Sequence, residues 1–397
     1  MEVADVIREF LDAQGRAPDL RMNVAQRQVL AALAACRTAQ LGGHVERCDN
    51  GSCDHERIAY NSCLDRHCPK CQALKQAKWL DARRKDLLPV PYFHVVFTLP
   101  QEASKVALQN KRVMYGILIR AASETLKQIA RDPKHLGAEI GFMAVLHTWG
   151  QTLLHHPHLH CVVPGGGLAS DSSRWIECRK NFFLPVQVLS QVFRGKFLDY
   201  LRIAYKKGQL RFAGKLEHLT HETEFETWCA ELRRKGWVVY AKAPFGGPQQ
   251  VLKYLARYTH RVAIANSRLV SLKNGKVSFR YKDYARGDAA RIMSVDVPEF
   301  ARRFTLHVLP RGFQRIRHYG LLANVCRKDK LQLSRDLLAA AGTDGLDLID
   351  PPGADKTEEP HNRCPKCHVG TVVVVEKLKP LRLTWPRGRP PRPLDSS

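Results

Sequence analysis

Apolar and polar positions recur along the chain with two periods, one typical of helices and one typical of strands. Residues 3–40 carry apolar side chains at helical spacing, and we expect two helices there, the second ending at Gly42-Gly43. Further helices are expected over residues 72–87, 102–131 and 185–235. Strands are expected over residues 92–99, 142–149 and 237–241, and Asn274-Gly275 between alternating runs predicts a hairpin. The pattern indicates a mixed fold of helices and strands.

One predicted strand carries unusual chemistry. Residues 155–160 read His-His-Pro-His-Leu-His and run into an apolar segment that three glycines end. Alternate side chains of a strand share a face, so His158 and His160 point to one face and Leu159 to the other. Two neutral imidazoles on one face can hold a divalent cation and leave positions open for a substrate oxygen. The alternatives are a structural zinc site and histidines packed in the core.

A second stretch, downstream of Gly246-Gly247-Pro248, is predicted to form a helix over residues 249–260. Tyr254 and Tyr258 stand four residues apart and therefore share one face of it. Lys253, Arg257 and Arg261 surround them. Two phenols ringed by cations suit a pair of nucleophiles aimed at phosphate, because cations lower the phenol pKa and neutralise the attacked diester. The alternative is that both rings are core aromatics.

The charge of the chain points to nucleic acid as its partner. Lys and Arg number 63 against 38 Asp and Glu, which gives a formal net charge of +25. An anionic membrane surface would compete, but no run approaches the ~20 apolar residues of a spanning helix. The amino terminus is acidic and lacks a basic region followed by an apolar core, so no secretory signal is expected. We therefore expect a cytoplasmic, nucleoid-associated protein that does not bind membranes.

Cysteines provide the clearest metal signal. The chain has 12, and in a cytoplasmic protein this number indicates metal ligands or free thiols before disulfides. Cys68-Pro-Lys-Cys71 forms a knuckle whose thiolates can converge on zinc, and Cys48 and Cys53 are predicted to complete that site. Further candidate ligands, enough for a second site, are His44, His55, Cys63 and His67.

The remaining cysteines divide into two groups. Cys364-Pro-Lys-Cys367 is predicted to be half of another metal site, with His361 and His368 as possible completing ligands. The cysteines without a spacing partner are interpreted as small buried hydrophobes, namely Cys36, Cys161, Cys178, Cys229 and Cys326.

Four segments have distinctive compositions. Residues 72–87 are basic and suit a phosphate backbone, or are a solvated helix face. Residues 300–320 interleave arginine with aromatics, which favours nucleic-acid contact slightly over a helix and strand that pack on the core. Residues 343–362 are acidic and contain prolines, as linkers do, and residues 377–392 are basic and predicted to be disordered.

Four features in this order resemble one known family: the cysteine-rich module ending in residues 66–72, the strand at 92–100, residues 155–167, and Tyr254-x-x-x-Tyr258. They are similar to transposases of the insertion-sequence ninety-one family, the two-tyrosine branch of the HUH single-strand endonucleases. The resemblance covers nearly the whole chain. One departure is the spacing of Cys48 and Cys53, with four intervening residues where two are expected.

The resemblance implies an α+β fold, in which an HUH-type nuclease core has a central antiparallel sheet flanked by helices and follows a helical, zinc-binding module. It implies a helical and zinc-binding DNA-recognition module at 1–88, a nuclease domain at 89–268, a β-rich continuation at 269–342, and a linker, knuckle and basic tail at 343–397. It also implies a third metal ligand beside His158 and His160, for which the candidates are His147, Gln151 and His94, in that order.

The activity implied by the resemblance is cutting and rejoining of single-stranded DNA. His158 and His160 are expected to hold magnesium or manganese, while Tyr254 or Tyr258 attacks the phosphate and forms a 5′-phosphotyrosine. Two nucleophiles permit rolling-circle-type transposition between element ends and target. The alternatives are a non-catalytic zinc-containing DNA-binding protein and a plasmid-type replication initiator or relaxase. A zinc hydrolase is a weaker option, because the sequence contains no His-Glu-x-x-His.

Overall fold

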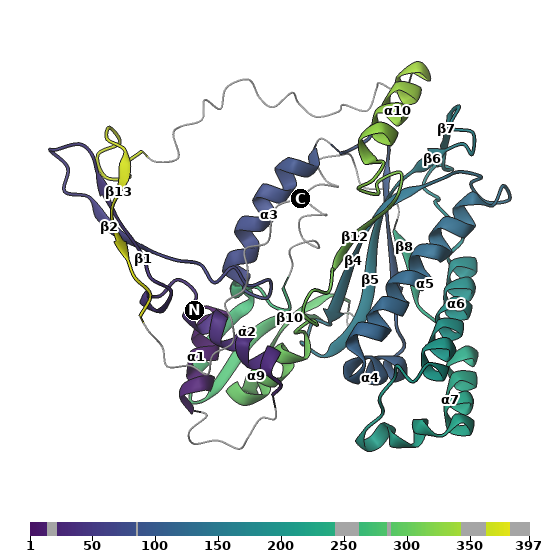
Figure 1. Ribbon diagram of the computed structural model, residues 1–397, viewed down its shortest axis with the longest axis horizontal. Coiled ribbons are helices and arrows are strands. Elements are labelled where there is room, and N and C mark those ends of the chain that lie inside the picture. Colours follow the sequence, from purple (N-terminus) through teal and green to yellow (C-terminus); the bar gives the residue numbers. More distant parts are fainter. Residues whose placement is uncertain (14–21, 85, 243–261, 284–286, 343–362, 382–397) are drawn as a thin grey trace.

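A computed structural model of the protein describes residues 1–13, 22–84, 86–242, 262–283, 287–342 and 363–381 (Figure 1). Its centre is a five-stranded sheet with the order β12-β4-β5-β3-β8, in which every neighbouring pair is antiparallel. The strands are β3 (Tyr92–Thr98), β4 (Gly141–Trp149), β5 (His155–Pro164), β8 (Val239–Lys242) and β12 (Ile316–Gly320). The predicted α+β fold with a central antiparallel sheet is confirmed.

Helices cover one face of this sheet (Figure 1). They are α4 (Gln101–Gln109), α5 (Lys111–Arg131), α6 (Val186–Lys206) and α7 (Glu222–Arg234), with the 3₁₀ helix η2 (Gly214–Thr220) between the last two. Alternate residues of β3 and β5, such as Phe97 and Leu159, are fully buried against them. The single helix expected at 102–131 is divided at Asn110, whose side-chain amide donates to the carbonyl of Arg211. A small hairpin, β6 (Gly166–Leu168) and β7 (Trp175–Glu177), follows β5.

A second core joins the two halves of the sequence. The amino-terminal helices α1 (Val3–Ala13) and α2 (Val24–Ala35) pack with a three-stranded sheet, β11-β10-β9, and with helix α9. The bounds of these later elements are η3 (Asn266–Arg268), β9 (Leu269–Lys273), β10 (Lys276–Asp283), β11 (Ala289–Asp296) and α9 (Val297–Leu306). The predicted hairpin is confirmed, since Asn274 and Gly275 both have positive φ between β9 and β10, as a type I′ turn requires.

The expectation that residues 300–320 form a nucleic-acid contact surface is wrong for their aromatic side chains. Phe300, Phe304 and Phe313 are buried in the two cores. The segment instead forms helix α9 and strand β12, which was the alternative. Arginines that alternate with buried rings are equally typical of an amphipathic helix, because a charged side chain then lies on its solvated face.

The described residues cover the other face of the central sheet, called the free face below, only in part. Helix α10 (Arg327–Ala340) packs near one end of it, where Leu331 and Leu338 join a core with Met143, Val145 and Val162. Met143 of β4 and Val162 of β5 are register partners on this face. The histidine-bearing positions of β4 and β5 lie on the same face, further along both strands. Among the described residues, no helix is both long and apolar enough to cross a membrane.

A third sheet unites the two ends of the chain. Strand β1 (Gly43–Cys48) lies between β2 (Glu56–Tyr60) and β13 (Val372–Leu378), and both pairings are antiparallel. In Figure 1 this sheet stands apart from the central sheet, at the far end of the amino-terminal helices. Helix α3 (Pro69–Arg84) lies between it and the central sheet in this view, and the 3₁₀ helix η1 (Ala39–Leu41) precedes β1 in the chain. The division into four domains stays a prediction, but residues 372–378 pair with the amino-terminal module.

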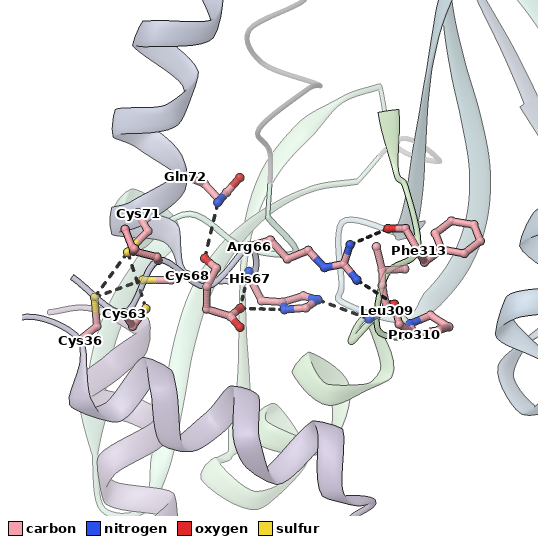
Figure 2. Close-up of polar contacts among 12 residues, drawn as sticks. Cys36, Cys63, Arg66, His67, Cys68, Cys71, Gln72, Leu309, Pro310 and Phe313 are labelled. Carbon is pink, nitrogen blue, oxygen red and sulfur yellow. Dashed lines mark hydrogen bonds and ion pairs between the residues drawn. The ribbon is translucent and has the colours of Figure 1, made fainter. Parts of the chain in front are cut away.

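Arg66 connects the cysteine-rich module to the segment that leads into β12 (Figure 2). Its guanidinium donates hydrogen bonds to the carbonyls of Phe313, at 2.6 Å, and Pro310, at 2.9 Å. Next to it, the amide of Leu309 donates to Nε2 of His67 at 3.3 Å, and His67 Nδ1 lies 2.8 Å from the Asp65 carboxylate. A charged donor that satisfies two main-chain carbonyls fixes both distance and orientation.

We expect Arg66→Ala to destabilise the protein by about 2–4 kcal/mol, because it removes two charge-assisted bonds, and of the two carbonyls that of Pro310 keeps the Phe313 amide as a donor. Chemical denaturation would measure this loss. Arg112→Ala is the matched control, since Arg112 donates to the carbonyl of Arg311 in the same segment but is exposed. Its effect should stay within about 0.5 kcal/mol. Equal effects of the two substitutions would contradict a connecting role for Arg66.

Candidate functional site

Three histidines converge on the free face of the central sheet. His147 of β4 is the register partner of His158 of β5, and His160 follows two residues later on the same face. One ring nitrogen of each residue lies within 4.8 Å of those of the other two. Of the three candidates for a third ligand, the structure therefore brings the first, His147, to the predicted pair.

Hydrogen bonds set the orientation of two of these rings. His158 Nδ1 lies 2.7 Å from the carbonyl oxygen of His156. A carbonyl only accepts, so Nδ1 carries the proton and a neutral His158 has its lone pair on Nε2. His160 Nδ1 lies 2.7 Å from Nε2 of His94 on the neighbouring strand. In metal sites, a ligating histidine usually forms a hydrogen bond through its other ring nitrogen, and this bond fixes its tautomer.

His94, the last of the three candidates, is thus a neighbour of the cluster and not a member of it. Its pKa is lowered to about 3, first by burial and then by the nearby Lys242 and His158. His94 is consequently neutral at physiological pH, and Nε2 of a neutral imidazole can accept a hydrogen bond from Nδ1 of His160. Gln151, the second candidate, lies in the turn after β4, where its main-chain carbonyl accepts from Arg268.

Other histidines of this region have structural contacts. His155 points towards α5, where its Nε2 lies 2.7 Å from the hydroxyl of Tyr115. His307, at the end of α9, places Nε2 3.0 Å from the carbonyl of Leu153 and Nδ1 3.2 Å from the hydroxyl of Thr148. Burial lowers the pKa of both histidines to about 3, so they are neutral links between elements. Only part of the histidine-rich stretch therefore faces the cluster.

Tyr254 and Tyr258 lie outside the described residues, but both flanks of their segment are described. On one side, Lys242 of the edge strand β8 is the register partner of His94. On the other side, Val262 is buried and lines a pocket together with Trp149. The Trp149 ring stacks on that of His147 with centroids 4.6 Å apart. The described residues on either side of the segment, Lys242 and Val262, are thus each placed beside a neighbour of the histidine cluster, His94 and Trp149 respectively.

The cysteines form two separate clusters, so the expected single site of Cys48, Cys53, Cys68 and Cys71 is wrong in its grouping. Cys68 and Cys71 converge with Cys36 and Cys63 at the start of α3 (Figure 2). Their sulfur atoms are 3.6–3.7 Å apart in the three closest pairs. Four thiolates around zinc, with Zn–S of about 2.3 Å, lie about 3.8 Å apart in a tetrahedron. This cluster therefore has the shape of a zinc site.

Cys36 was not recognised as a ligand from the sequence. It follows the last residue of α2 and has no partner at knuckle spacing, and its interpretation as an isolated buried hydrophobe misses the three cysteines beside it. Its burial in the core with Cys68 and Cys71 is real, but the contact is between sulfur atoms. A cysteine at the end of a helix, close before a cysteine-rich loop, is the one signal that could have indicated it.

Cys48 and Cys53 lie instead with Cys364 and Cys367. The candidate ligand His67 is occupied by the contacts to Leu309 and Asp65 described above, and His44 Nε2 lies 2.9 Å from Glu46. Neither these two histidines nor His55 belongs to any of the ligand clusters formed by described residues. The cysteines alone therefore make up the two sites.

Comparison with known proteins agrees with this organisation. The family model described as a transposase zinc-binding domain matches residues 6–99, and the one described as a putative transposase matches residues 141–330. The "Putative transposase y4qJ" of Sinorhizobium fredii is 54% identical over 380 residues, which cover 94% of this chain and 95% of the relative. The "Transposase for insertion sequence element IS801" of Pseudomonas savastanoi pv. phaseolicola is 29% identical and covers 75% of this chain and 71% of the relative.

Among solved structures, that of TrwC complexed with a 27-mer DNA comprising the recognition hairpin and the cleavage site matches 64% of this chain and 75% of its own. The sequence identity is 14% and the TM-score is 0.22, a likeness too distant to support an argument. The family rests on the two family models and on the sequence relatives, the first of which covers 94% of this chain. The chain belongs to the insertion-sequence ninety-one family of transposases.

Proposed function

We propose that this transposase nicks and rejoins single-stranded DNA at element ends through a 5′-phosphotyrosine intermediate. One observation carries the proposal: three imidazoles converge on the free face of the sheet, and the described residues that flank the tyrosine-bearing segment lie beside neighbours of these imidazoles. In this reading His147, His158 and His160 hold a divalent ion, and Tyr254 and Tyr258 are the nucleophiles.

The donor set fits such an ion. His158 has its lone pair on Nε2, and His160 can have the same tautomer if Nδ1 donates to His94. When bound, the ion would polarise the scissile phosphate and neutralise part of its charge. Three nitrogen ligands suit manganese better than magnesium, which prefers oxygen ligands in a strict octahedron. Of the two expected ions, manganese is the better match to these residues.

The bond changes balance without a nucleotide cofactor. The phenolic oxygen of one tyrosine loses its proton and forms a bond to phosphorus, while the bond from phosphorus to the 3′ oxygen breaks. That oxygen takes up a proton and becomes a free 3′-hydroxyl. One phosphodiester replaces another, so a different 3′-hydroxyl can reverse the step and join new strands. A second tyrosine allows another strand to be held before the first is released.

The remainder of the chain suits DNA as partner. The net charge of +25 favours the phosphate backbone, and the zinc-binding module at 1–88 would recognise the element end. Such a protein would work in the cytoplasm at the nucleoid. A plasmid-type replication initiator or relaxase would share the nuclease chemistry. A non-catalytic DNA-binding protein would bind DNA without forming any covalent product, which makes that product the decisive observation.

Replacement of both tyrosines should abolish covalent capture of DNA. Wild-type protein, a labelled single-stranded oligonucleotide with an element end, and manganese should give an adduct that survives denaturing electrophoresis. Tyr254→Phe and Tyr258→Phe should each retain part of it, and the double variant none, because phenylalanine has no nucleophilic oxygen. If the wild type binds the oligonucleotide but yields no adduct with either metal, the catalytic proposal fails.

The metal ligands can be tested separately from the nucleophiles. We expect His147→Ala to raise the manganese concentration for half-maximal adduct formation by at least about 10–100-fold. That range is typical for loss of a residue that only orients a metal ligand, and loss of a ligand itself should cost no less. Electron paramagnetic resonance of bound manganese provides a direct readout. His156→Ala is the control, because the His156 ring contacts His158 but belongs to no ligand cluster of the described residues, and its main-chain carbonyl, which accepts from His158, is kept. A manganese dependence unchanged in His147→Ala would remove His147 from the ligand set.

The zinc of the first cluster can be tested at the cysteine that the sequence did not indicate. Cys36→Ser should remove one zinc ion per chain and lower the melting temperature, because a structural zinc site contributes folding energy directly. Elemental analysis of the purified protein measures the zinc. Cys161→Ala is the matched control, a buried cysteine outside the clusters. A full zinc content in Cys36→Ser would contradict ligation by Cys36.

A further inference from the structure

We propose that Cys48, Cys53, Cys364 and Cys367 form a second zinc site that fastens the carboxyl-terminal strand to the amino-terminal module. The two family models that match the chain end at residues 99 and 330, so neither reaches Cys364 or Cys367. The site would close the chain between Cys53 and Cys364 into one long loop through the metal.

The sulfur geometry supports zinc and argues against a disulfide. Cys48 Sγ lies 3.7 Å from Cys367 Sγ, and Cys53 Sγ lies 3.8 Å from Cys364 Sγ. All four sulfur atoms lie within 4.8 Å of one another. A disulfide has sulfur atoms about 2.05 Å apart, whereas a tetrahedral zinc site holds them about 3.8 Å apart. Each short contact joins one cysteine from each end of the chain.

The carboxyl-terminal half has the local structure of a zinc knuckle. The amide of Lys366 donates to Cys364 Sγ at 3.4 Å, and the amide of Gly370 donates to Cys367 Sγ at 3.3 Å. Donors of this kind stabilise the thiolate that zinc requires. The turn closes through the amide of Cys364, which donates to the carbonyl of Gly370 at 2.8 Å. The knuckle therefore presents two sulfur atoms in an orientation set by its own backbone.

Close packing at Gly370 joins this knuckle to the other half of the site. A Cβ atom at position 370 would lie 2.5 Å from Cys48 Sγ, a distance that no side chain tolerates without a shift. Glycine thus allows the main chain of one end to approach the sulfur of the other. Glycine is needed here because any larger side chain would collide with Cys48. It is not needed to allow an unusual backbone conformation within the knuckle.

Main-chain contacts hold the two halves together beside the cysteines. Cys48, the last residue of β1, is the register partner of Val372, the first residue of β13. The amide of Asp49 donates to the carbonyl of Thr371 at 2.9 Å, and its carboxylate accepts from the amide of Thr371 at 2.6 Å. Lys366 forms an ion pair with Asp54. The ligands are consequently brought together by a paired interface.

The alternative completion of the knuckle by histidines fits less well. His368 follows Cys367 directly but is not among the clustered ligands, and His361 lies outside the described residues. The four cysteines already supply a complete tetrahedral set. A site shared by two distant pairs of cysteines also predicts a distinct zinc content. Removal of either pair, or of both pairs together, must lower the content by one zinc ion per chain.

Zinc stoichiometry of full-length variants tests the shared site. A thiol-specific mercurial releases only thiolate-bound zinc, so the histidine cluster does not contribute to the count. Wild type should release two equivalents, one per cysteine cluster. Cys48→Ser/Cys53→Ser, Cys364→Ser/Cys367→Ser and the variant with all four changes should each release one. His368→Ala and Cys326→Ser are controls that should release two.

A second measurement keeps the test valid if a variant folds poorly. A protease site inserted within residues 343–362 of the otherwise unchanged chain allows the carboxyl-terminal piece to be cut off after folding. That piece should co-elute with the remainder during size exclusion and should separate after mercurial treatment. Two zinc equivalents in Cys364→Ser/Cys367→Ser, additive losses in the four-cysteine variant, or separation of the cut piece with zinc still bound would overturn the proposal.

Discussion

The register between β4 and β5 is the constraint on which the candidate site depends. A slip of one residue would send His147 to the opposite face and Leu146 to the histidine face. Leu146 and Leu159 are fully buried against the helices, and exposure of each would cost roughly 1.5–3 kcal/mol. Burial of the apolar face of the sheet therefore fixes the register that places the histidines on the other face. Three histidines can cluster because the residues between them cannot leave the core.

The amino-terminal module is attached to this sheet by polar contacts to main-chain atoms. Arg66 and His67 immediately precede Cys68 and contact the segment at 309–313, which continues into β12. β12 in turn pairs with β4, the strand that carries His147. One short motif thus holds zinc ligands and, next to them, the residues that dock the module. The module also meets this strand directly, because Arg66, His67 and Trp149 of β4 line one pocket.

Much of the fold follows from local rules, and most errors lie where a distant residue decides. The period of two places His158 and His160 correctly, and Asn274-Gly275 specifies its hairpin without outside help. The break at Asn110 could not be foreseen, because it depends on Arg211, about 100 residues away. The same holds for cysteines: spacing identifies the Cys68 knuckle as metal-binding, but only the tertiary structure assigns its partners.

Residues close in sequence can also be misleading for a physical reason. His67 lies beside a knuckle and has the right chemistry for zinc, yet its two nitrogens face a backbone amide and a carboxylate. The aromatics between 300 and 320 suggested a stacking surface, but a buried face and a binding face share one composition until the packing partner is known. The sequence identifies side chains that are able to bind metal or nucleic acid. The residues packed around each side chain determine which of them are placed to do so.

The position of β1 in the middle of its sheet has a consequence for synthesis of the protein. β1 leaves the ribosome early, whereas its second partner, β13, is made roughly 320 residues later, which at typical bacterial rates takes about 15–65 seconds. During that interval one edge of β1 lacks its final neighbour, and an unpaired edge is a template for wrong pairing. A prematurely terminated chain would keep that open edge permanently. Completion of this sheet therefore distinguishes a finished polypeptide from a truncated one.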